Sequence, residues 1–341
     1  MLRPRHDNPL TATLAGLGDL LRARREGTPV APDPRDRLEG RTALVTGANT
    51  GLGKAVAVEL ARLGARVRMA CRSGIPEAGE EVKRRSGNGA VEMLPVDLSD
   101  LSRVHGLCDE LAHRGDRLDV VVLNAGVVCK QARRSVQGLD LMFAVNFLAN
   151  VVLTDRLVCD GVVAPPSSHP GNGSAPRPRI LFVSSDTHRT ADAVDFTRFG
   201  EPVEYDAMGS LKQYGHTKLL VSTYACELAR RLEPQGISVH HLCPGAVNTD
   251  IARDAPPWVK PALGWLMGRF FRSPERAAGP VSYLAAARAI EGETGIYLHM
   301  ETRKPAGERA LDPAAGARLW DASHALVARL AGADSGRQAA P

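Results

Sequence analysis

The 341-residue sequence lacks the features that mark several classes of protein. It contains no dense run of lysine and arginine, and a formal net charge of +5 is small for this length, so nothing favours a nucleic-acid partner. Its six cysteines form no C-x-x-C pair, and most of them lie in apolar runs. We therefore predict buried, reduced thiols in a cytoplasmic protein, with neither a disulfide framework nor a metal site.

Long apolar runs are also absent from the sequence. No stretch reaches the roughly 20 apolar residues of a membrane-spanning helix. Residues 10–21 form an amphipathic stretch that carries Asp19 and lacks the apolar run and cleavage site of a signal peptide. This stretch fits peripheral contact with a membrane or packing on the protein's own surface, and we favour the second. Hydrophobic residues make up 44% of the chain and charged residues 24%, as in an ordinary soluble protein.

The stretch T-G-A-N-T-G-L-G at residues 46–53 follows an apolar run and precedes an amphipathic helical pattern. Gly47 lets the chain leave a strand sharply, Gly51 lets phosphate oxygens approach the backbone, and Gly53 lets the helix pack close to a sheet. The free N–H groups and the dipole at the helix start favour an anion such as a dinucleotide pyrophosphate. A glycine-rich turn alone could also be a plain loop, so the rest of the chain must decide.

Strand-like and helical patterns alternate after this turn. We expect strands at residues 43–45, 66–70, 91–96, 118–123, 179–183, 237–242 and 295–300. We expect helices from the glycine turn to Gly64, at 76–86, after a cap at Ser99 or Asp100, at 139–159, at 214–232, from Ser273 onward, and at 313–330. This alternation predicts an α/β fold: a single-domain, Rossmann-type, doubly wound parallel sheet of about seven strands, with helices on both faces.

The sequence also suggests how the chain is divided around this domain. Residues 1–38 form a lead segment that ends in a turn-rich stretch, the domain itself covers 39–305, and 306–341 form a C-terminal helix and tail. Residues 161–177 are rich in proline, serine and glycine, and we predict a surface loop inserted before the fifth strand.

A second polar cluster is Y-G-H-T-K at residues 214–218. Tyr214 and Lys218 share a helix face at i and i+4. An ammonium beside a phenol favours the phenolate, so we expect Lys218 to lower the pKa of Tyr214 and let it exchange a proton with a substrate oxygen near neutral pH. Such a pair is common on helix surfaces, but together with the upstream glycine turn it becomes a strong signal.

Further polar groups follow the predicted strands. Ser184 and Ser185 end the fifth strand, residues 124–126 (N-A-G) end the fourth, and Asn146 lies in the helix between them. In open α/β sheets, ligands bind at the carboxyl ends of the strands. We therefore expect these residues to lie around one site with Tyr214.

Short motifs recur along the chain in a fixed order: M-A-C-R at 69–72, V-D-L-S at 96–99, L-N-A-G at 123–126, V-N-F-L at 145–148, V-S-S at 183–185 and P-G-A-V-N-T at 244–249. With the glycine turn and Y-G-H-T-K, these motifs make the chain resemble the short-chain dehydrogenases/reductases from about Gly40 to Lys304. Within that family, the resemblance is to the retinol-dehydrogenase-like and WW-domain-oxidoreductase-like branch.

This resemblance implies a role for each catalytic candidate. Tyr214 would be the catalytic acid/base, and Lys218 would lower its pKa and hold the nicotinamide ribose. Ser185 would hydrogen-bond the substrate oxygen, Asn146 would hold a water that links Lys218 to solvent, and Ser184 would be structural.

The resemblance also implies a set of cofactor-binding residues. Pro244, Gly245, Val247 and Thr249 match a loop that contacts the nicotinamide amide, and Asp97 and Leu98 match positions that hold adenine. The full predicted set is Gly47, Asn49, Thr50, Gly51, Leu52, Gly53, Arg72, Asp97, Leu98, Asn124, Ala125, Gly126, Tyr214, Lys218, Pro244, Gly245, Val247 and Thr249.

The end of the second strand bears on cofactor choice. An acidic residue there would bind the ribose 2′-hydroxyl of NAD, whereas an arginine accommodates a 2′-phosphate. This chain has Cys71-Arg72, and Lys54 directly follows the glycine turn. We therefore favour NADP(H) over NAD(H), with a solvated loop arginine at Arg72 as the alternative.

Residues 250–272 bear on the substrate. This irregular stretch holds several prolines and a set of large apolar residues that includes Trp258 and Trp265. In the family that the chain resembles, this region is a lid over the substrate, and its apolarity suggests a lipophilic carbonyl or alcohol. Packing of the stretch on the body or on another subunit is an equal alternative, which leaves a homo-oligomer open.

Together these observations predict an NADP-dependent oxidoreductase that transfers hydride between the nicotinamide and a small carbonyl or alcohol substrate. An isomerase or dehydratase of nucleotide-sugars would carry a larger C-terminal substrate domain than this chain can hold. The remaining alternative is a non-catalytic NADP(H)-sensing or scaffold protein on the same fold. The set Asn146, Ser185, Tyr214 and Lys218 favours the enzyme, since a sensor would not need all four.

Overall fold

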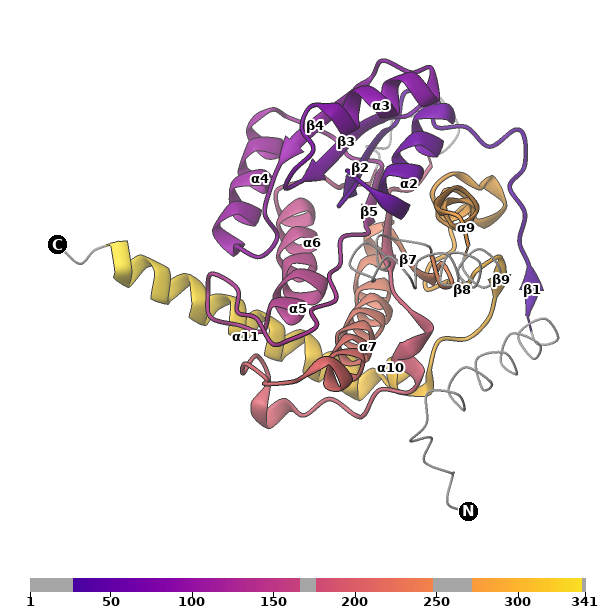
Figure 1. The fold of residues 1–341 in the computed structure, drawn as a ribbon. Helices are drawn as coiled ribbons and strands as arrows, with labels where there is room; N and C mark the ends of the chain where they lie inside the picture. Colours follow the sequence, from indigo (N-terminus) through magenta and orange to yellow (C-terminus); the bar gives the residue numbers. More distant parts are fainter. Residues whose placement is uncertain (1–26, 166–175, 248–271, 339–341) are drawn as a thin grey trace, which may run out of the picture.

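The computed structural model describes residues 27–165, 176–247 and 272–338. Within them, one sheet of nine strands runs through the centre, in the order β1-β9-β8-β7-β6-β5-β2-β3-β4 (Figure 1). The strands are β1 Thr28–Pro29, β2 Thr42–Thr46, β3 Arg66–Cys71, β4 Val91–Pro95, β5 Val120–Leu123, β6 Arg179–Val183, β7 Ser238–Cys243, β8 Tyr297–His299 and β9 Thr302–Arg303.

Strands β2 to β8 are parallel and match the predicted sheet of about seven strands. Every residue of β2, β5, β6 and β7 is buried, as expected for parallel strands covered on both faces. The two short strands that the sequence did not reveal, β1 and β9, add an antiparallel edge to the sheet. Thr28 and Pro29, which belong to the predicted lead segment, are therefore part of the sheet.

Helices cover both faces of this sheet (Figure 1). They are α2 Gly51–Arg62, α3 Glu77–Ser86, α4 Leu101–His113, α5 Leu141–Phe143, α6 Ala149–Cys159, α7 Ala207–Leu232, α9 Pro274–Ala286, α10 Glu308–Leu311 and α11 Pro313–Gln338. Neighbouring residues of one strand face opposite layers: Ala43 and Val45 pack with α2, α3 and α9, whereas Leu44 packs with α4, α6 and α7. The doubly wound arrangement follows from this alternation.

Local signals placed several helix starts correctly. The Asp100 side chain caps α4 by accepting a hydrogen bond from the Ser102 N–H, and Ser273 caps α9 with Pro274 at its first position. The predicted helix over 139–159 contains a π-helical turn at Ala144–Leu148 between α5 and α6. The helix predicted from Tyr214 begins earlier, at Ala207.

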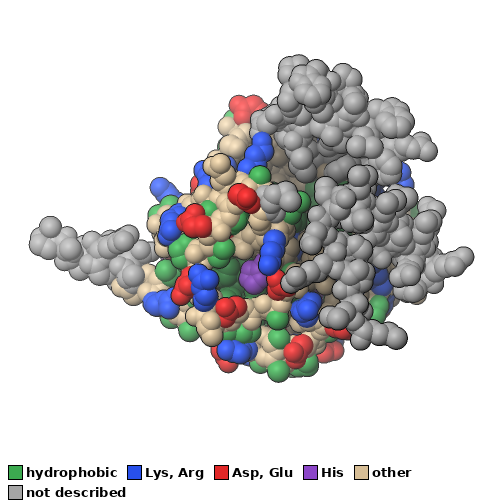
Figure 2. Space-filling view, turned by 60° about the horizontal axis from the view of Figure 1, so that its bottom comes forward, with side chains coloured by type: hydrophobic (Ala, Val, Ile, Leu, Met, Phe, Trp, Pro, Cys, Tyr) green, Lys and Arg blue, Asp and Glu red, His purple; other side chains and the backbone are tan. Residues whose placement is uncertain are grey.

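The helical stretch Leu141–Cys159 is the one part of the described chain that is long and apolar enough to cross a membrane. Its mean hydropathy is 1.5, and 83% of the window is buried inside the protein. Composition of this kind is also that of a core helix in a soluble protein, so it carries little weight as a sign of a membrane span. On the face shown in Figure 2, lysine and arginine side chains alternate with acidic and apolar ones, with no basic stripe among the described residues.

Parts of several sequence-based predictions lie outside the described residues. These are residues 1–26 of the predicted lead segment, with the amphipathic stretch 10–21, residues 166–175 of the predicted insertion at 161–177, the nicotinamide-loop residue Thr249, most of the predicted lid over 250–272, and residues 339–341 of the predicted tail.

Candidate active site

The predicted site residues gather at the carboxyl edge of the parallel strands. The glycine turn follows β2, residues 124–126 follow β5, Ser184 and Ser185 follow β6, and residues 244–245 follow β7. These four strands are neighbours in the sheet, in the order β7-β6-β5-β2. Loops that are far apart in the sequence therefore meet at one edge, where open α/β sheets bind ligands.

The glycine turn has the geometry that its sequence predicts. Gly47 and Gly51 have positive φ angles of 64° and 54°, which side chains other than glycine rarely adopt. A Cβ on Gly53 would lie 2.3 Å from the Gly47 carbonyl oxygen and 2.5 Å from Nδ2 of Asn124, so only glycine fits there. Thr50, at the start of α2, makes no capping hydrogen bond with its side chain. The first N–H groups of α2 therefore lack a side-chain cap.

Thr46 and Asn124 brace this turn against the loop after β5. The Thr46 hydroxyl oxygen accepts hydrogen bonds from the N–H groups of Asn124 and Ala125, each at 3.0 Å. Nδ2 of Asn124 donates to the carbonyl oxygens of Thr46 at 3.0 Å and Gly47 at 3.3 Å. The Asn124 side chain thus holds the glycine turn against the loop after β5. Thr46 is a supporting residue whose role the sequence alone did not indicate.

The basic residues near the turn differ in how free they are. Nζ of Lys54 lies 2.6 Å from a carboxylate oxygen of Glu81, so the charge of Lys54 is compensated by α3. The Arg72 side chain remains 69% exposed, with Nη1 at 3.7 Å from Oδ2 of Asp97. Arg72 is therefore a solvent-exposed basic side chain at the end of β3.

Leu52 and Leu98, both predicted to contact the cofactor, have buried side chains. Leu52 packs in the apolar cluster with α2 and α9, and Leu98 packs in the cluster on the opposite face of the sheet. Any contact of these two residues with a ligand would come from their backbone. Asn49 lies at the surface of the turn, where Nδ2 donates a hydrogen bond of 3.3 Å to the Ser73 hydroxyl.

Lys218 is buried to 3% exposure, and Nζ donates a hydrogen bond of 2.8 Å to the Val183 carbonyl oxygen. Burial in this apolar position lowers the pKa of Lys218 to about 8. A Cβ on Gly126 would lie 3.6 Å from Nζ of Lys218 and 3.4 Å from Oδ1 of Asn146. The absence of a side chain at Gly126 therefore leaves room beside both residues.

Asn146 lies in the π-helical turn, where its side chain pairs with the loop after β5. Oδ1 accepts a hydrogen bond of 2.7 Å from the Val127 N–H, and Nδ2 donates to the Val127 carbonyl at 3.0 Å and to the Thr217 hydroxyl at 3.2 Å. The Asn146 carbonyl accepts a hydrogen bond of 2.8 Å from Nδ2 of Asn150. The side chain of Asn146 thus ties the loop after β5 to α7 beside Lys218.

Tyr214 lies on the same helix face as Lys218, with Nζ of Lys218 5.5 Å from the centre of the Tyr214 ring. Its pKa, however, is raised to about 12, because burial disfavours the phenolate. The expectation that Lys218 lowers the pKa of Tyr214 is therefore not met in this structure. The Lys218 ammonium is directed at the Val183 carbonyl, whereas burial and the neighbouring Cys243 both raise the pKa of Tyr214.

The two serines after β6 have different environments. Ser184 is buried, with its hydroxyl 2.7 Å from that of Ser222 and donating to the Lys218 carbonyl at 3.2 Å. These contacts fit the structural role expected of Ser184. Ser185 is half-buried, and its hydroxyl oxygen accepts a hydrogen bond of 3.3 Å from the Thr187 N–H. Because that bond uses a lone pair, the hydroxyl hydrogen of Ser185 remains available to a ligand.

The loop after β7 is shaped by its packing. Gly245 has a φ of 84°, and a Cβ there would lie 3.1 Å from Met300 and 3.2 Å from Arg272. Val247 pairs with Arg272 in a parallel β-bridge, so the chain on both sides of residues 248–271 meets beside the site. Arg272 also donates to the Glu301 carboxylate and to the Pro244 carbonyl.

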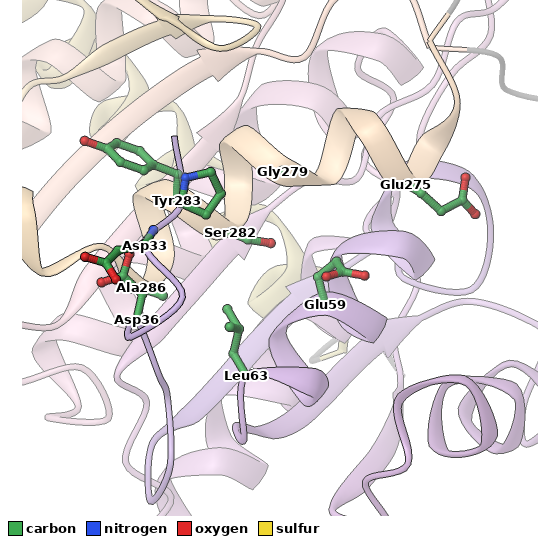
Figure 3. A pocket seen from close by; sticks show the side chains of 10 residues that line it. Asp33, Asp36, Glu59, Leu63, Glu275, Gly279, Ser282, Tyr283 and Ala286 are labelled. Atoms are coloured by element: carbon green, nitrogen blue, oxygen red, sulfur yellow. The ribbon is translucent and has the colours of Figure 1, made fainter. Parts of the chain in front are cut away.

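A hollow lies between α2, α9 and residues 32–36, away from the residues described above (Figure 3). Its volume is about 120 Å³, and its labelled lining includes Asp36, Glu59, Glu275 and Tyr283. None of the predicted site residues lines it. Each of its carboxylates already has an arginine or backbone partner.

The chain is similar to known proteins over most of its length. A family model described as short chain dehydrogenase matches residues 41–187. "Retinol dehydrogenase 14" of Homo sapiens is 33% identical over 326 residues, which cover 91% of this chain and 91% of that protein. "Dehydrogenase/reductase SDR family member 13" of Bos taurus is 36% identical over 306 residues, covering 87% of this chain and 76% of that protein.

A solved structure described as "Pseudomonas aeruginosa RhlG/NADP active-site complex" has the same fold. It is 26% identical to this chain, covers 79% of it and 98% of its own length, and has a TM-score of 0.59.

Proposed function

This chain belongs to the short-chain dehydrogenase/reductase family, and on that premise we propose that it is an NADP(H)-dependent oxidoreductase for lipophilic carbonyl or alcohol substrates. Its general type, a retinol-dehydrogenase-like oxidoreductase, follows from the similarity over nearly the whole chain. The preference for NADP(H), the lipophilic substrate and the residue roles are the parts that we propose.

The observation that carries the proposal is the convergence of four polar residues beside the glycine turn. Ser185 follows β6, and Lys218 on α7 donates to the Val183 carbonyl at the end of that strand. Tyr214 lies beside Lys218 on α7, and Asn146 bonds the loop after β5 from the π-helical turn. Gly126 leaves space next to Asn146 and Lys218, as the distances from its missing Cβ indicate. This constellation is typical of a site that moves a proton to or from a substrate oxygen.

The residues at this edge fit a phosphorylated dinucleotide. The uncapped start of α2 and the positive φ of Gly51 provide backbone N–H groups for a pyrophosphate. Arg72 would hold the 2′-phosphate, because its guanidinium is largely exposed. The end of β3 carries Cys71 and Arg72, and neither position holds the acidic residue that would bind a ribose 2′-hydroxyl. Asn49 and Thr50 would add polar contacts along the turn, and residues 244–247 would face the nicotinamide end. NADP is also named in the solved complex that shares this fold.

When bound, the nicotinamide would supply a hydride to the carbonyl carbon or accept one from the alcohol carbon. The Ser185 hydroxyl would donate a hydrogen bond to the substrate oxygen and polarise it. The Tyr214 hydroxyl would donate its proton to that oxygen during reduction. Because burial raises the pKa of Tyr214 to about 12, this residue carries its proton at neutral pH, which is the form that the reducing direction requires.

Lys218 would keep a positive charge next to Tyr214 as the proton leaves. With a pKa of about 8, its ammonium form predominates at pH 7 and is lost on moderate alkalinisation. Asn146 would hold the loop after β5 in place for this pair, through its two bonds to Val127. A link from Lys218 to solvent through water near Asn146 is part of the same proposal.

Two exposed apolar side chains support a lipophilic substrate. Val128, 53% exposed, follows the loop that Asn146 holds, and Leu211, 69% exposed, lies one helical turn before Tyr214. Apolar groups beside a polar centre would bind the hydrocarbon part of a substrate whose oxygen lies at Tyr214. Retinol, named in the human relative, is a molecule of this kind. We also propose a cytoplasmic location, in keeping with six free cysteines.

Turnover of NADPH with decanal, and with a panel of ketones, tests the proposal. Tyr214→Phe should abolish turnover and leave NADPH binding, measured by fluorescence titration, largely intact. Tyr283→Phe is the matched control. Tyr283 lines the hollow beside α9, which contains none of the predicted site residues, so removing the Tyr283 hydroxyl should not change turnover.

The same assay separates the enzyme from a non-catalytic NADP(H)-sensing protein on this fold. A wild-type protein that binds NADPH tightly but reduces no carbonyl in the panel would favour the sensor. Unchanged turnover by Tyr214→Phe would remove Tyr214 from the mechanism.

A further inference from the structure

His188 lies three residues after the proposed substrate-binding serine and is fully buried, with 0% of its surface exposed. It belongs to the short 3-10 helix Asp186–Arg189 that follows Ser185. Its ring packs against the edge of Tyr297, with 5.4 Å between ring centres and an interplanar angle of 79°. Within the described residues, the hydrogen bonds of the His188 ring go to backbone groups, the Ser185 carbonyl and the Gly307 N–H.

The hydrogen-bond partners of the His188 ring determine which of its nitrogens carries the hydrogen. The Gly307 N–H donates a hydrogen bond of 2.9 Å to Nε2 of His188, and a backbone N–H can only donate. Nε2 therefore carries the lone pair, and burial lowers the pKa of His188, which keeps the ring neutral. The hydrogen must then be on Nδ1, which donates to the Ser185 carbonyl oxygen at 2.7 Å.

His188 thus forms a bridge from the backbone of Ser185 to the segment before α10. A Cβ on Gly307 would lie 3.0 Å from Cδ2 and 3.1 Å from Nε2 of His188, so glycine permits this close approach. On the other side, the Ser185 carbonyl accepts from the ring and, at 3.1 Å, from the backbone N–H of His188, while the Ser185 hydroxyl accepts from the Thr187 N–H. The backbone N–H of residue 188 sets the turn, and the ring adds the bond that ties the backbone of Ser185 to Gly307.

We propose that His188 is a positioning residue that holds the Ser185 hydroxyl where it can donate to the substrate oxygen. The inference rests on the proposed function of Ser185 and adds a residue outside the set that the sequence predicted. The alternative is a purely structural cross-link, in which the bond to Gly307 matters and the bond to Ser185 does not.

Two substitutions at this position separate the bonds. In His188→Asn, the amide nitrogen is bonded to Cγ, as Nδ1 of histidine is, and can still donate to the Ser185 carbonyl. In His188→Gln, the amide oxygen lies one bond further out, near the place of Nε2, and can still accept from the Gly307 N–H. Each variant keeps one bond of the bridge and loses the other.

Steady-state reduction of decanal by NADPH is the assay, with thermal melting as the control for folding. We expect His188→Gln to lower kcat by about ten-fold or more, because a reacting group that loses its fixed position loses effective concentration. His188→Asn should lower kcat by roughly three-fold or less. The NADPH dissociation constant should stay the same in both variants.

A double-mutant cycle with Ser185→Ala gives a readout that a structural cross-link would not change. Once the Ser185 hydroxyl is gone, there is nothing left to position, so adding His188→Gln should cost little further kcat. Additive losses in the cycle, or a larger loss in His188→Asn than in His188→Gln, would overturn the proposal.

The proposed function fails in a different way. If wild-type protein does not reduce decanal, or if Ser185→Ala keeps full kcat, then the function assigned to the site is wrong and the role of His188 falls with it. If Ser185→Ala is impaired but the two His188 variants melt lower and have unchanged kcat, only the positioning proposal is overturned.

Discussion

Replacing Lys218 with methionine should make the protein more stable while removing its proposed activity. Lys218 is 3% exposed, and burial lowers its pKa from the ordinary 10.5 to about 8. At roughly 1.4 kcal/mol for each pH unit, keeping the charge in the folded protein at pH 7 costs about 3 kcal/mol. Methionine preserves most of the apolar stem and carries no charge.

Part of this gain is offset by a lost contact. Nζ of Lys218 donates to the Val183 carbonyl, and leaving that acceptor unpaired costs about 1 kcal/mol. The free energy of unfolding of Lys218→Met at pH 7 should therefore exceed that of the wild type by about 2 kcal/mol. Urea unfolding followed by circular dichroism measures this difference. Lys212→Met is the matched control on the same helix, since the Lys212 side chain is 77% exposed and its removal should bring no such gain.

The pH dependence provides a sharper check. Below about pH 8, Lys218 is charged in both the folded and the unfolded state, so the full cost is present. Between about pH 8 and pH 10.5, the folded protein has released this proton while the unfolded chain still holds it, so wild-type stability rises relative to the variant. The advantage of Lys218→Met should therefore shrink over that range. A variant that is less stable than the wild type at pH 7, or an advantage that stays constant up to pH 10.5, would refute the reasoning.

Three further predictions follow from charges and packing. Arg72→Glu should raise the dissociation constant of NADPH by about ten-fold or more and leave that of NADH nearly unchanged in fluorescence titrations; an equal effect on both would remove the 2′-phosphate contact. Gly53→Ala should lower the free energy of unfolding by about 2 kcal/mol in urea, because its Cβ would lie 2.3 Å from the Gly47 carbonyl; wild-type stability would contradict the assigned packing. The hydrogen bond to Asp155 raises the pKa of His324, so this pair stabilises the fold fully below about pH 6.5 and loses its effect as pH rises through the folded-state pKa. The stability advantage of the wild type over His324→Gln should accordingly be larger near pH 6 than near pH 9, and the reverse order would count against it.

The sequence predicted those parts of the fold that local patterns determine. The bounds of β6, 179–183, are those expected from its apolar run, and Ser273 begins α9 as its capping sequence suggests. Both depend on neighbours in the chain: a run of apolar residues, or a cap with proline at the next position. The positions of the strand-end loops followed from the parallel sheet, because all parallel strands end at one edge.

Features that depend on distant partners could not be read in this way. Strands β1 and β9 have two residues each, too few for any period, and they exist only through pairing, β9 with β8 and β1 with β9. Lys54, which directly follows the glycine turn, pairs with Glu81 on another helix. For Tyr214, the spacing to Lys218 was right, but the direction of its pKa shift depends on how much water its hydroxyl loses, which only the packed structure reveals.

The pairing of β1 with β9 has a consequence for how the protein is made. Thr28, near the start of the described chain, is hydrogen-bonded into the sheet beside Arg303, near the end of the domain. During synthesis, residues 28–29 can therefore pair with β9 only after almost the whole domain has left the ribosome. Until then the edge of β7 has no neighbour on that side, since β8 is also made late. The central strands can assemble first, and the outermost part of the sheet is the last to close.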